Sequence, residues 1–167
     1  LHDGFFFFFY VQIKGYDAFS KYFRSDFFQL ILFKAGKANL SLNLIDYQVE
    51  KNDFIVCAPF DIKRVNSYKN SDHSVIVFTS DFLEKSGILK NSSEVLKYFT
   101  SQYSPQWKLE EYEAQQLNAL MEDVSHRHDN LNNHIFGKEL LYLSFSIFLY
   151  ELASIGNKYS KSIIKQN

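Results

Sequence analysis

The first 80 residues contain short apolar runs, and several of these runs alternate apolar with polar positions. The clearest alternation spans 38–44, where an apolar residue stands at every second position, and it predicts a half-buried strand. A turn is expected at 34–37, with Gly36 adopting a positive φ, and a second turn at 51–53. Further strands are expected at 5–13, 26–33, 47–49, 54–58, 62–68 and 73–79. Short strands with frequent turns predict a β-sandwich or a β-barrel.

After residue 80 the pattern becomes helical. A short helix through Phe99 is expected first. An amphipathic helix is predicted for 109–126, and a polar break follows at 129–133. A second long helix is predicted for 134–155, with Gly156 as the residue that ends it.

The last predicted helix is apolar on more than one face, whereas a surface helix needs only one apolar stripe. It therefore needs cover on two sides, and two explanations remain open. Either a second subunit covers one side, or the helix is buried between the β-barrel and the preceding helix. For the subunit interface, the candidate residues are Leu140, Leu143, Ile147 and Tyr150.

The composition is that of an ordinary globular protein, with 46% hydrophobic and 22% charged residues in 167. The formal net charge of -1 lacks the basic excess of a nucleic-acid-binding segment. The single cysteine, Cys57, rules out an internal disulfide framework and suits a reducing cytoplasm. No apolar stretch reaches the roughly 18 residues of a membrane span, and no signal-peptide pattern precedes the first strand. We therefore expect a cytoplasmic protein without a membrane partner, and, because the sequence begins with Leu1, a piece of a longer chain.

Two motifs in the strand region carry a family resemblance. In the first, RSDFFQ at 24–29 ends in Gln29, and Gly36 follows seven residues later. In the second, KNDFIVCAP ends at Pro59, and Arg64 follows five residues later. The strand block resembles a cupin barrel. The combined pattern resembles the N-terminal ligand domain of AraC-type transcription regulators, over roughly residues 22–156.

The resemblance implies a mainly β plus α fold. A cupin-type antiparallel β-barrel of jelly-roll form would be followed by a C-terminal antiparallel helical hairpin. The implied divisions are a ligand-sensing barrel at 1–80, a short helix and connecting loop at 81–108, a dimerising hairpin at 109–156 and a linker at 157–167. Two helix-turn-helix motifs would follow outside this sequence, and DNA would be contacted by those motifs and not by this segment.

The sequence departs from metal-binding cupins at three positions. Ser25 and Arg64 stand where those cupins have histidines, and Gln29 stands where they have a glutamate. A guanidinium has no free lone pair and cannot coordinate a metal ion. We therefore expect no metal, no cofactor and no metal-dependent enzyme activity.

Polar and aromatic residues around these motifs are candidates for contacting a small molecule. By strand parity and the resemblance, Gln29 points into the barrel, and an arginine there would suit a carboxylate or hydroxyl-rich ligand. The alternatives are an internal salt bridge from the arginine to Asp46, Asp53 or Asp61, and ordinary core packing for the aromatic residues. The ligand-binding candidates are Arg24, Gln29, Tyr47, Arg64, Asn66, His73 and Trp107.

Two further groups have simpler explanations. His126, His128 and His134 lie around the polar break between the long helices, where a solvated turn is expected rather than a metal site. Cys57 lies in an apolar strand with no adjacent base, so we expect an inert thiol. No phosphate-binding glycine loop, serine elbow or zinc-ligand spacing is found in the sequence.

The resemblance implies the effector-sensing and dimerisation domain of a bacterial AraC-family regulator. A sugar or small metabolite would bind in a metal-free barrel, and the homodimer would change how its DNA-binding domains are presented. Two alternatives remain. One is a stand-alone cupin enzyme of the sugar isomerase or dioxygenase type, and the other is a carbohydrate-binding module.

Overall fold

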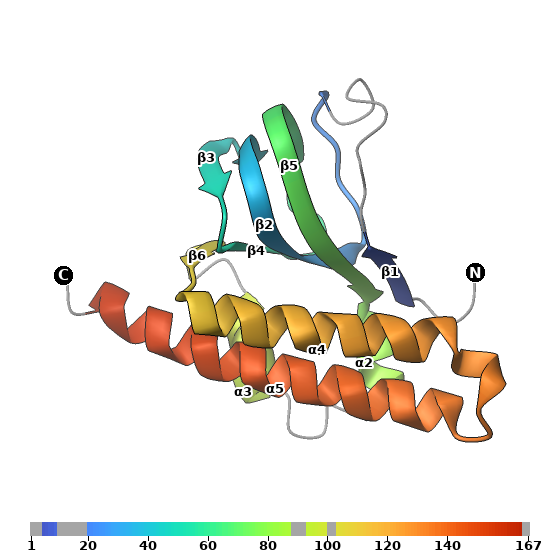
Figure 1. The fold of residues 1–167 in the computed structure, drawn as a ribbon. Helices are drawn as coiled ribbons and strands as arrows, with labels where there is room; N and C mark the ends of the chain where they lie inside the picture. The colour runs from blue at the N-terminus through green and yellow to red at the C-terminus, as the bar shows by residue number, and fades with distance from the viewer. Residues whose placement is uncertain (1–4, 10–19, 88–92, 100–102, 165–167) are drawn as a thin grey trace.

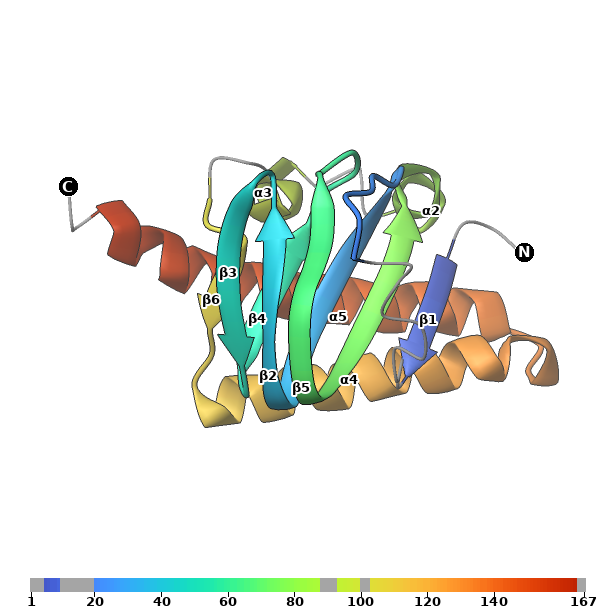
Figure 2. The same ribbon diagram turned by 90° about the horizontal axis from the view of Figure 1, so that it is seen from above.

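The computed structural model describes residues 5–9, 20–87, 93–99 and 103–164. Within these ranges one six-stranded antiparallel sheet curls above a layer of two long helices (Figure 1). Seen from above, the two helices run behind the sheet (Figure 2). The strands are β1 (Phe5–Phe9), β2 (Phe27–Leu42), β3 (Ile45–Glu50), β4 (Asp53–Cys57), β5 (Lys63–Thr79) and β6 (Gln106–Lys108). Their order is β1-β5-β2-β4-β6, and β3 pairs with β2.

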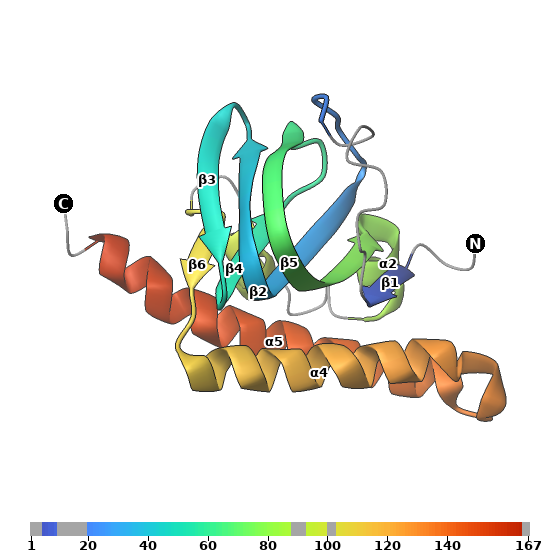
Figure 3. The same ribbon diagram turned by 45° about the horizontal axis from the view of Figure 1, so that its top comes forward.

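The long strands β2 and β5 curl together, and this curl gives the sheet its half-barrel form (Figure 3). Gly36 lies in the middle of β2 with a φ of 75°, and a Cβ added there would lie 2.1 Å from the carbonyl oxygen of Asn70. Register shifts occur on both sides of this glycine. The turn expected at 34–37 is therefore wrong, because the glycine bends one continuous strand instead of reversing the chain. The strands expected at 62–68 and 73–79 are likewise parts of one strand, β5.

The curled sheet has a hydrophobic core on each face. Successive residues of a strand point to opposite faces, so β4, which is covered on both sides, is buried along its whole length. The sheet residues that pack towards the helices are Leu30, Leu32, Phe54, Val56, Ile76 and Phe78. The interior core of the half-barrel consists of Phe33, Ala38, Leu42, Val49, Ile55 and Cys57.

A two-residue turn, Asn43-Leu44, joins β2 to β3. The φ angles of 50° and 69° at these two residues are those of a type I′ hairpin turn. The Leu44 side chain is 68% exposed, whereas Leu42 is buried. The alternation predicted for 38–44 thus ends at Leu42, and Leu44 belongs to the turn.

The helical elements are α2 (Ser80–Lys85), α3 (Ser93–Leu96), α4 (Glu111–Asp129) and α5 (Gly137–Ile164), with 3-10 turns η2 (Lys97–Phe99) and η3 (Leu131–Asn133). The chain reverses at η3, so that α4 and α5 lie side by side and antiparallel (Figures 1 and 3). α4 begins with a capping box, in which the side chains of Glu110 and Glu113 each accept a hydrogen bond from the other residue's backbone N–H. The helix predicted for 109–126 is therefore confirmed, with its ends shifted by two or three residues.

α5 continues through Gly156 to Ile164, so the helix end expected at Gly156 is wrong. A Cβ added at Gly156 would lie 2.8 Å from the ring of Trp107. Glycine inside a helix costs about 1 kcal/mol relative to alanine, and the close approach of this ring explains its presence. Trp107 belongs to β6, a three-residue strand that the sequence did not predict.

The segment Gly137–Tyr159 of α5 is long and apolar enough to cross a membrane by length and composition alone. This differs from the expectation that no stretch reaches that length. Half of its most apolar window is buried inside the protein, where Leu141, Phe145 and Phe148 belong to the core beneath the sheet. Core helices of soluble proteins pass the same test, so the feature is weak evidence for a membrane span.

Candidate functional site

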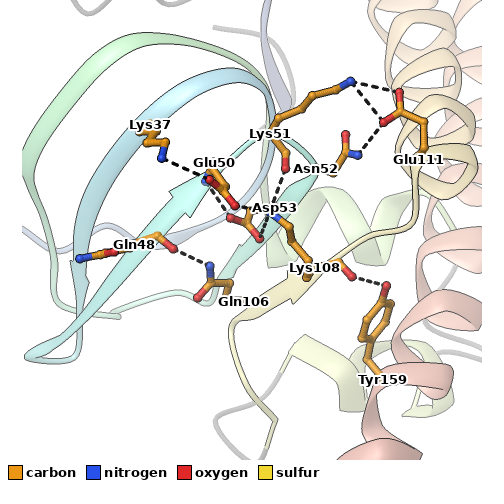
Figure 4. Close-up of polar contacts among 10 residues, drawn as sticks. All are labelled: Lys37, Gln48, Glu50, Lys51, Asn52, Asp53, Gln106, Lys108, Glu111 and Tyr159. Atoms are coloured by element: carbon orange, nitrogen blue, oxygen red, sulfur yellow. Dashed lines mark hydrogen bonds and ion pairs between the residues drawn. The ribbon is translucent and has the colours of Figure 1, made fainter.

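β3 and β6 are the two strands that border the open side of the half-barrel, and two side-chain contacts bridge them (Figure 4). Gln106 donates from Nε2 to the carbonyl oxygen of Gln48 at 2.7 Å, and Lys108 Nζ lies 3.1 Å from the Glu50 carboxylate. An open pocket of about 770 Å³ lies beside these bridges, and we call it the seam pocket. Its lining residues are Lys37, Ala38, Asn39, Gln48, Val49, Glu50, Asp53, Ser67, Tyr68, Lys69, Gln106 and Lys108. Two of them belong to the interior core, so the pocket opens directly above that core.

Charged groups of both signs meet in the seam pocket. Glu50 lies 3.1 Å from Lys108 and 3.7 Å from Lys37. The hydrogen bond from Lys108 and the charges of both lysines hold the pKa of Glu50 below its ordinary value. Lys108 also lies 3.7 Å from Asp53, whose side chain is only 3% exposed and accepts a hydrogen bond from the Glu50 N–H. With its amide and hydroxyl groups, the pocket suits a compact ligand that both donates and accepts hydrogen bonds.

The turn between β3 and β4 connects the seam pocket to α4. The turn predicted at 51–53 is confirmed, with a φ of 69° at Asn52. From this turn, Lys51 Nζ lies 3.2 Å from the Glu111 carboxylate, and the Asn52 side-chain amide donates to the same carboxylate at 2.8 Å. These contacts lower the pKa of Glu111, with the hydrogen bond from Asn52 contributing most. The rim of the pocket is thereby tied to the first turn of α4.

A second set of contacts connects the seam pocket to the end of α5. Tyr159 donates a hydrogen bond to the main-chain carbonyl of Lys108 and lies 3.0 Å from Glu113 of α4. Lys158 forms an ion pair of 2.8 Å with the same Glu113, which is buried. Burial alone would raise the pKa of Glu113, but hydrogen bonds from Lys158, the Glu110 N–H and Tyr159 lower it overall. Burial and the neighbouring Glu113 raise the pKa of Tyr159.

None of the seven ligand candidates chosen from the sequence is among the residues that line the seam pocket. Two of them, Arg64 and Asn66, do lie together. Arg64 donates from Nε to the Asn66 side chain at 2.5 Å, and Asn66 donates to Asn39 and Asp46 at 2.9 and 3.1 Å. The Arg64 guanidinium lies 4.3 Å from the ring centroid of Tyr22.

This group lies on the outer face of the half-barrel, not in its interior. Arg64 is paired with Ser41, while the preceding residue, Lys63, is paired with Leu42 of the interior core. Paired residues on neighbouring antiparallel strands point to the same face, and adjacent residues point to opposite faces. Lys63, rather than Arg64, therefore points inward.

The remaining candidates are spread over the fold. Gln29 is half-buried and paired with Cys57 of the interior core, as parity predicted, whereas Arg24 is exposed. His73 is half-buried beside Phe33, at 5.4 Å between ring centroids, and burial lowers its pKa. Tyr47 lines a second, smaller pocket.

Trp107 is a core residue in this structure. Its side chain is 3% exposed, and its ring stacks on Phe54 at 5.9 Å and on Tyr159 at 6.4 Å. The indole N–H donates to the Ser104 carbonyl at 2.9 Å. Trp107 therefore joins the sheet to α5 and lies away from the seam pocket lining.

Lys63, a buried cation, was not predicted from the sequence. Lys63 is only 4% exposed, and its Nζ donates a hydrogen bond to Ser25 Oγ at 2.5 Å. The same Nζ lies 5.7 and 5.6 Å from the ring centroids of Phe23 and Phe27. Burial lowers the pKa of Lys63. Its position one residue before the motif arginine was the signal, but the parity of β5 was needed to interpret it. Among the described residues, no group of three histidine, cysteine, aspartate or glutamate side chains could hold a metal ion.

Cys57 is buried and belongs to the interior core. Burial raises the pKa of its thiol to about 12, so the thiolate is negligible at neutral pH. The inert thiol expected from the sequence is therefore confirmed.

The four candidates for a subunit interface lie on one side of α5. Leu143, Ile147 and Tyr150 are 61%, 54% and 47% exposed, and Leu140 is half-buried. With Phe136, which is 56% exposed just before the helix, they repeat at intervals of four and three residues. This spacing gives a continuous apolar stripe of the kind that pairs helices. The opposite side of α5 packs on the core, so the rest of the described chain leaves this stripe uncovered.

The likenesses of this chain to the following solved structures are distant. No family model matches the chain, and no curated protein matches it. The plu4264 protein from Photorhabdus luminescens is similar with a TM-score of 0.33 and 20% identity, over 42% of this chain and 62% of that one. The AraC-like transcriptional activator CuxR is similar with a TM-score of 0.47 and 14% identity, over 80% of this chain and 43% of that one. ToxT from Vibrio cholerae O395, bound to (E)-4-(8-methylnaphthalen-1-yl)but-3-enoic acid, is similar with a TM-score of 0.43 and 15% identity. The match covers 81% of this chain and 50% of that one.

The chain spans less than two thirds of the length of each of these three proteins. With every TM-score below 0.5, these likenesses do not assign the chain to a family.

Proposed function

We infer that this chain is the effector-sensing and dimerisation domain of an AraC-type bacterial transcription regulator. It binds a small molecule at the half-barrel without a metal ion, pairs with a second copy through α5, and controls DNA binding by a domain outside this sequence. In this role it has no enzyme activity of its own, and it acts in the cytoplasm.

The observation that carries the proposal is that the seam pocket shares residues with the contacts that hold the two long helices. Lys108 lines the pocket with its side chain, and its carbonyl accepts the hydrogen bond from Tyr159 of α5. The turn beside Asp53 holds Glu111 at the start of α4. A ligand that draws Lys108 or this turn towards itself would favour one arrangement of the helices over another, which is a population shift.

The pocket chemistry favours a neutral, hydroxyl-rich ligand such as a monosaccharide. The lining offers the side-chain amide of Gln106 and the hydroxyl of Tyr68, whose half-exposed ring can also stack on a sugar ring. The lining carries three lysines and two carboxylates, and Glu50 and Lys108 compensate each other at 3.1 Å, so these two groups do not require an ionic ligand.

The experiment is a thermal-unfolding panel of monosaccharides, including L-arabinose, D-xylose, D-glucose and D-galactose, at about 10 mM. A monosaccharide that raises Tm is then used in hydrogen-exchange measurements of the same chain. Slower exchange in the first turn of α4 and the last turns of α5 supports the sensing function. A sugar that binds while leaving exchange at both sites unchanged contradicts it.

Two variants separate binding from transmission and locate the ligand. Tyr159→Phe keeps the ring but removes the hydrogen bond to Lys108, so the sugar should bind as before with a smaller exchange change in α5. Gln106→Ala should weaken binding if the ligand occupies the seam pocket. Arg64→Ala should weaken it instead if the ligand binds among the sequence-derived candidates.

A further inference from the structure

A second pocket, of about 240 Å³, lies where the β2–β3 hairpin meets the segment before β6, and we call it the aromatic pocket. We propose that this pocket binds a small organic cation. Its aromatic lining comes from three parts of the chain, namely Tyr47 of β3, Tyr98 and Phe99 of η2, and Tyr103 of the following loop. The proposal is independent of the seam pocket and of the regulatory function proposed above.

The charge of the aromatic pocket favours a cation. Asp61 is the one charged side chain among the described residues that line it. The faces of aromatic rings attract cations, and a carboxylate nearby adds a full negative charge. Burial raises the pKa of Tyr47, so its phenol stays neutral at neutral pH. Among the described residues, the lining itself therefore carries one formal negative charge, that of Asp61, which a bound cation would help to neutralise.

Hydrogen bonds hold the Asp61 carboxylate in place. The Ala58 N–H donates to Oδ2 at 2.7 Å, and the Asn43 side-chain amide donates to Oδ1 at 2.9 Å. Each carboxylate oxygen can accept a second hydrogen bond, so both retain capacity for a ligand. An anion that is already ordered loses little conformational freedom when the ligand binds.

Two lysines lie near the aromatic pocket but are not among the described residues that line it, and one of them, Lys63, interacts electrostatically with Asp61. Lys63 donates to Ser25 Oγ, on the interior side of the half-barrel. Lys97 lies 5.0 Å from the ring centroid of Tyr98. The second contact is itself a cation–π interaction, so one ring of the lining already accommodates an ammonium group on its surface.

The size of the aromatic pocket limits the ligand to a compact group. Its volume of about 240 Å³ is below the range of roughly 300–1,000 Å³ that is typical for drug-sized ligands. A trimethylammonium group or a short alkylamine has the required size and charge.

The test compares choline with 3,3-dimethylbutan-1-ol, in which carbon replaces the quaternary nitrogen. The two molecules have nearly the same shape and differ in charge. In calorimetric or NMR titrations of the full chain, choline should bind at least about tenfold more tightly than its neutral analogue. Equal affinities overturn the proposal, and so does the absence of choline binding.

Variants of the protein test whether the Asp61 charge and the aromatic rings bind the cation. Asp61→Asn should weaken choline binding by about tenfold and leave the neutral analogue unchanged. Asp129→Asn is the control, because it removes the same charge from a side chain that is 70% exposed at the end of α4. It should change the affinity for neither choline nor the neutral analogue. Because Asp61 also anchors its turn, a second variant, Tyr103→Leu, leaves the Asp61 hydrogen bonds intact. It should lower the affinity for choline by about threefold. Choline binding at wild-type strength in both variants would show that the assignment is wrong.

Discussion

Tyr159, near the end of α5, donates its hydroxyl hydrogen to the main-chain carbonyl of Lys108 on β6. The Lys108 side chain extends to Glu50 and Asp53 in the seam pocket (Figure 4). A single residue thus contacts the pocket through its side chain and α5 through its backbone. β6 is therefore the element best placed to transmit a change in the pocket to the helices.

Removing the Lys108 ammonium should destabilise the protein. In Lys108→Met, the Asp53 carboxylate, with its side chain 3% exposed, loses its nearest cation, and we expect a loss of about 1–3 kcal/mol in the free energy of unfolding. Urea titration at neutral pH measures this loss. Lys37→Met is the matched control, because Lys37 is 78% exposed and its pair with Glu50 should contribute less than about 0.5 kcal/mol. Equal losses in the two variants would mean that Lys108 does not compensate a buried charge.

Glu113 should make stability depend on pH in the acid range. Its pKa is lower in the folded protein than the ordinary value of 4.5, so the unfolded state binds more protons. Its contribution is present above about pH 4.5 and is lost as the pH falls through the folded-state pKa. Glu113→Gln should therefore be less stable than the wild type by about 1–3 kcal/mol at neutral pH, and the difference should shrink in acid.

Urea titrations of both proteins at several pH values measure this effect. Glu84→Gln, at an exposed position on α2, is the control and should track the wild type throughout. A difference between Glu113→Gln and the wild type that stays constant down to acid pH would contradict the role of the carboxylate.

The exposed stripe of α5 should pair two subunits. Leu143→Glu or Ile147→Glu places a charge in the middle of this stripe, so we expect monomers or insoluble protein in analytical ultracentrifugation. Leu44→Glu, at a residue that is 68% exposed in the β2–β3 turn, should leave the dimer unchanged. If both α5 variants remain soluble dimers of wild-type affinity, the interface lies elsewhere.

Gly36 should be intolerant of a side chain. Gly36→Ala combines a positive φ with a Cβ that would lie 2.1 Å from the Asn70 carbonyl oxygen. We therefore expect the free energy of unfolding to fall by roughly 3 kcal/mol, or the variant to fail to fold. Gly87→Ala has nearly the same φ, 77°, but its Cβ would meet nothing within 4 Å. It should lose only about 1 kcal/mol. The difference between the variants, measured by urea unfolding, isolates the close approach of β5 to β2, and equal losses would contradict it.

The sequence predicted features that depend on local chemistry. The amphipathic pattern of α4, the β3–β4 turn and the buried strand β4 are each set by neighbours within a few residues. Local chemistry alone does not determine the structure around Gly36. Its positive φ was predicted, but a hairpin turn and a bulge in a continuous strand require the same backbone conformation, and only the partner strand distinguishes them.

The candidate site was harder to predict, because its residues are distant in the sequence. Gln48 and Gln106 are 58 positions apart and meet only because the sheet curls. Trp107 looked like a stacking residue, and only its contacts with Phe54 and Tyr159 place it in the core. The pairing of β2 with β5 shifts register between Asn39 and Leu40 of β2. Because of this shift, the alternation of inward and outward side chains at Lys63 and Arg64 does not continue that of the rest of β5. The inward direction of Lys63 could not be read from alternation alone.

The measurement that tests the central claim most directly is the nucleotide sequence of the parent gene beyond the codon for Asn167. The proposed role as a regulator's sensing domain predicts two helix-turn-helix units within about the next hundred residues, which is a typical domain length. A stop codon close to that point, or a following domain with no DNA-binding motif, would contradict it.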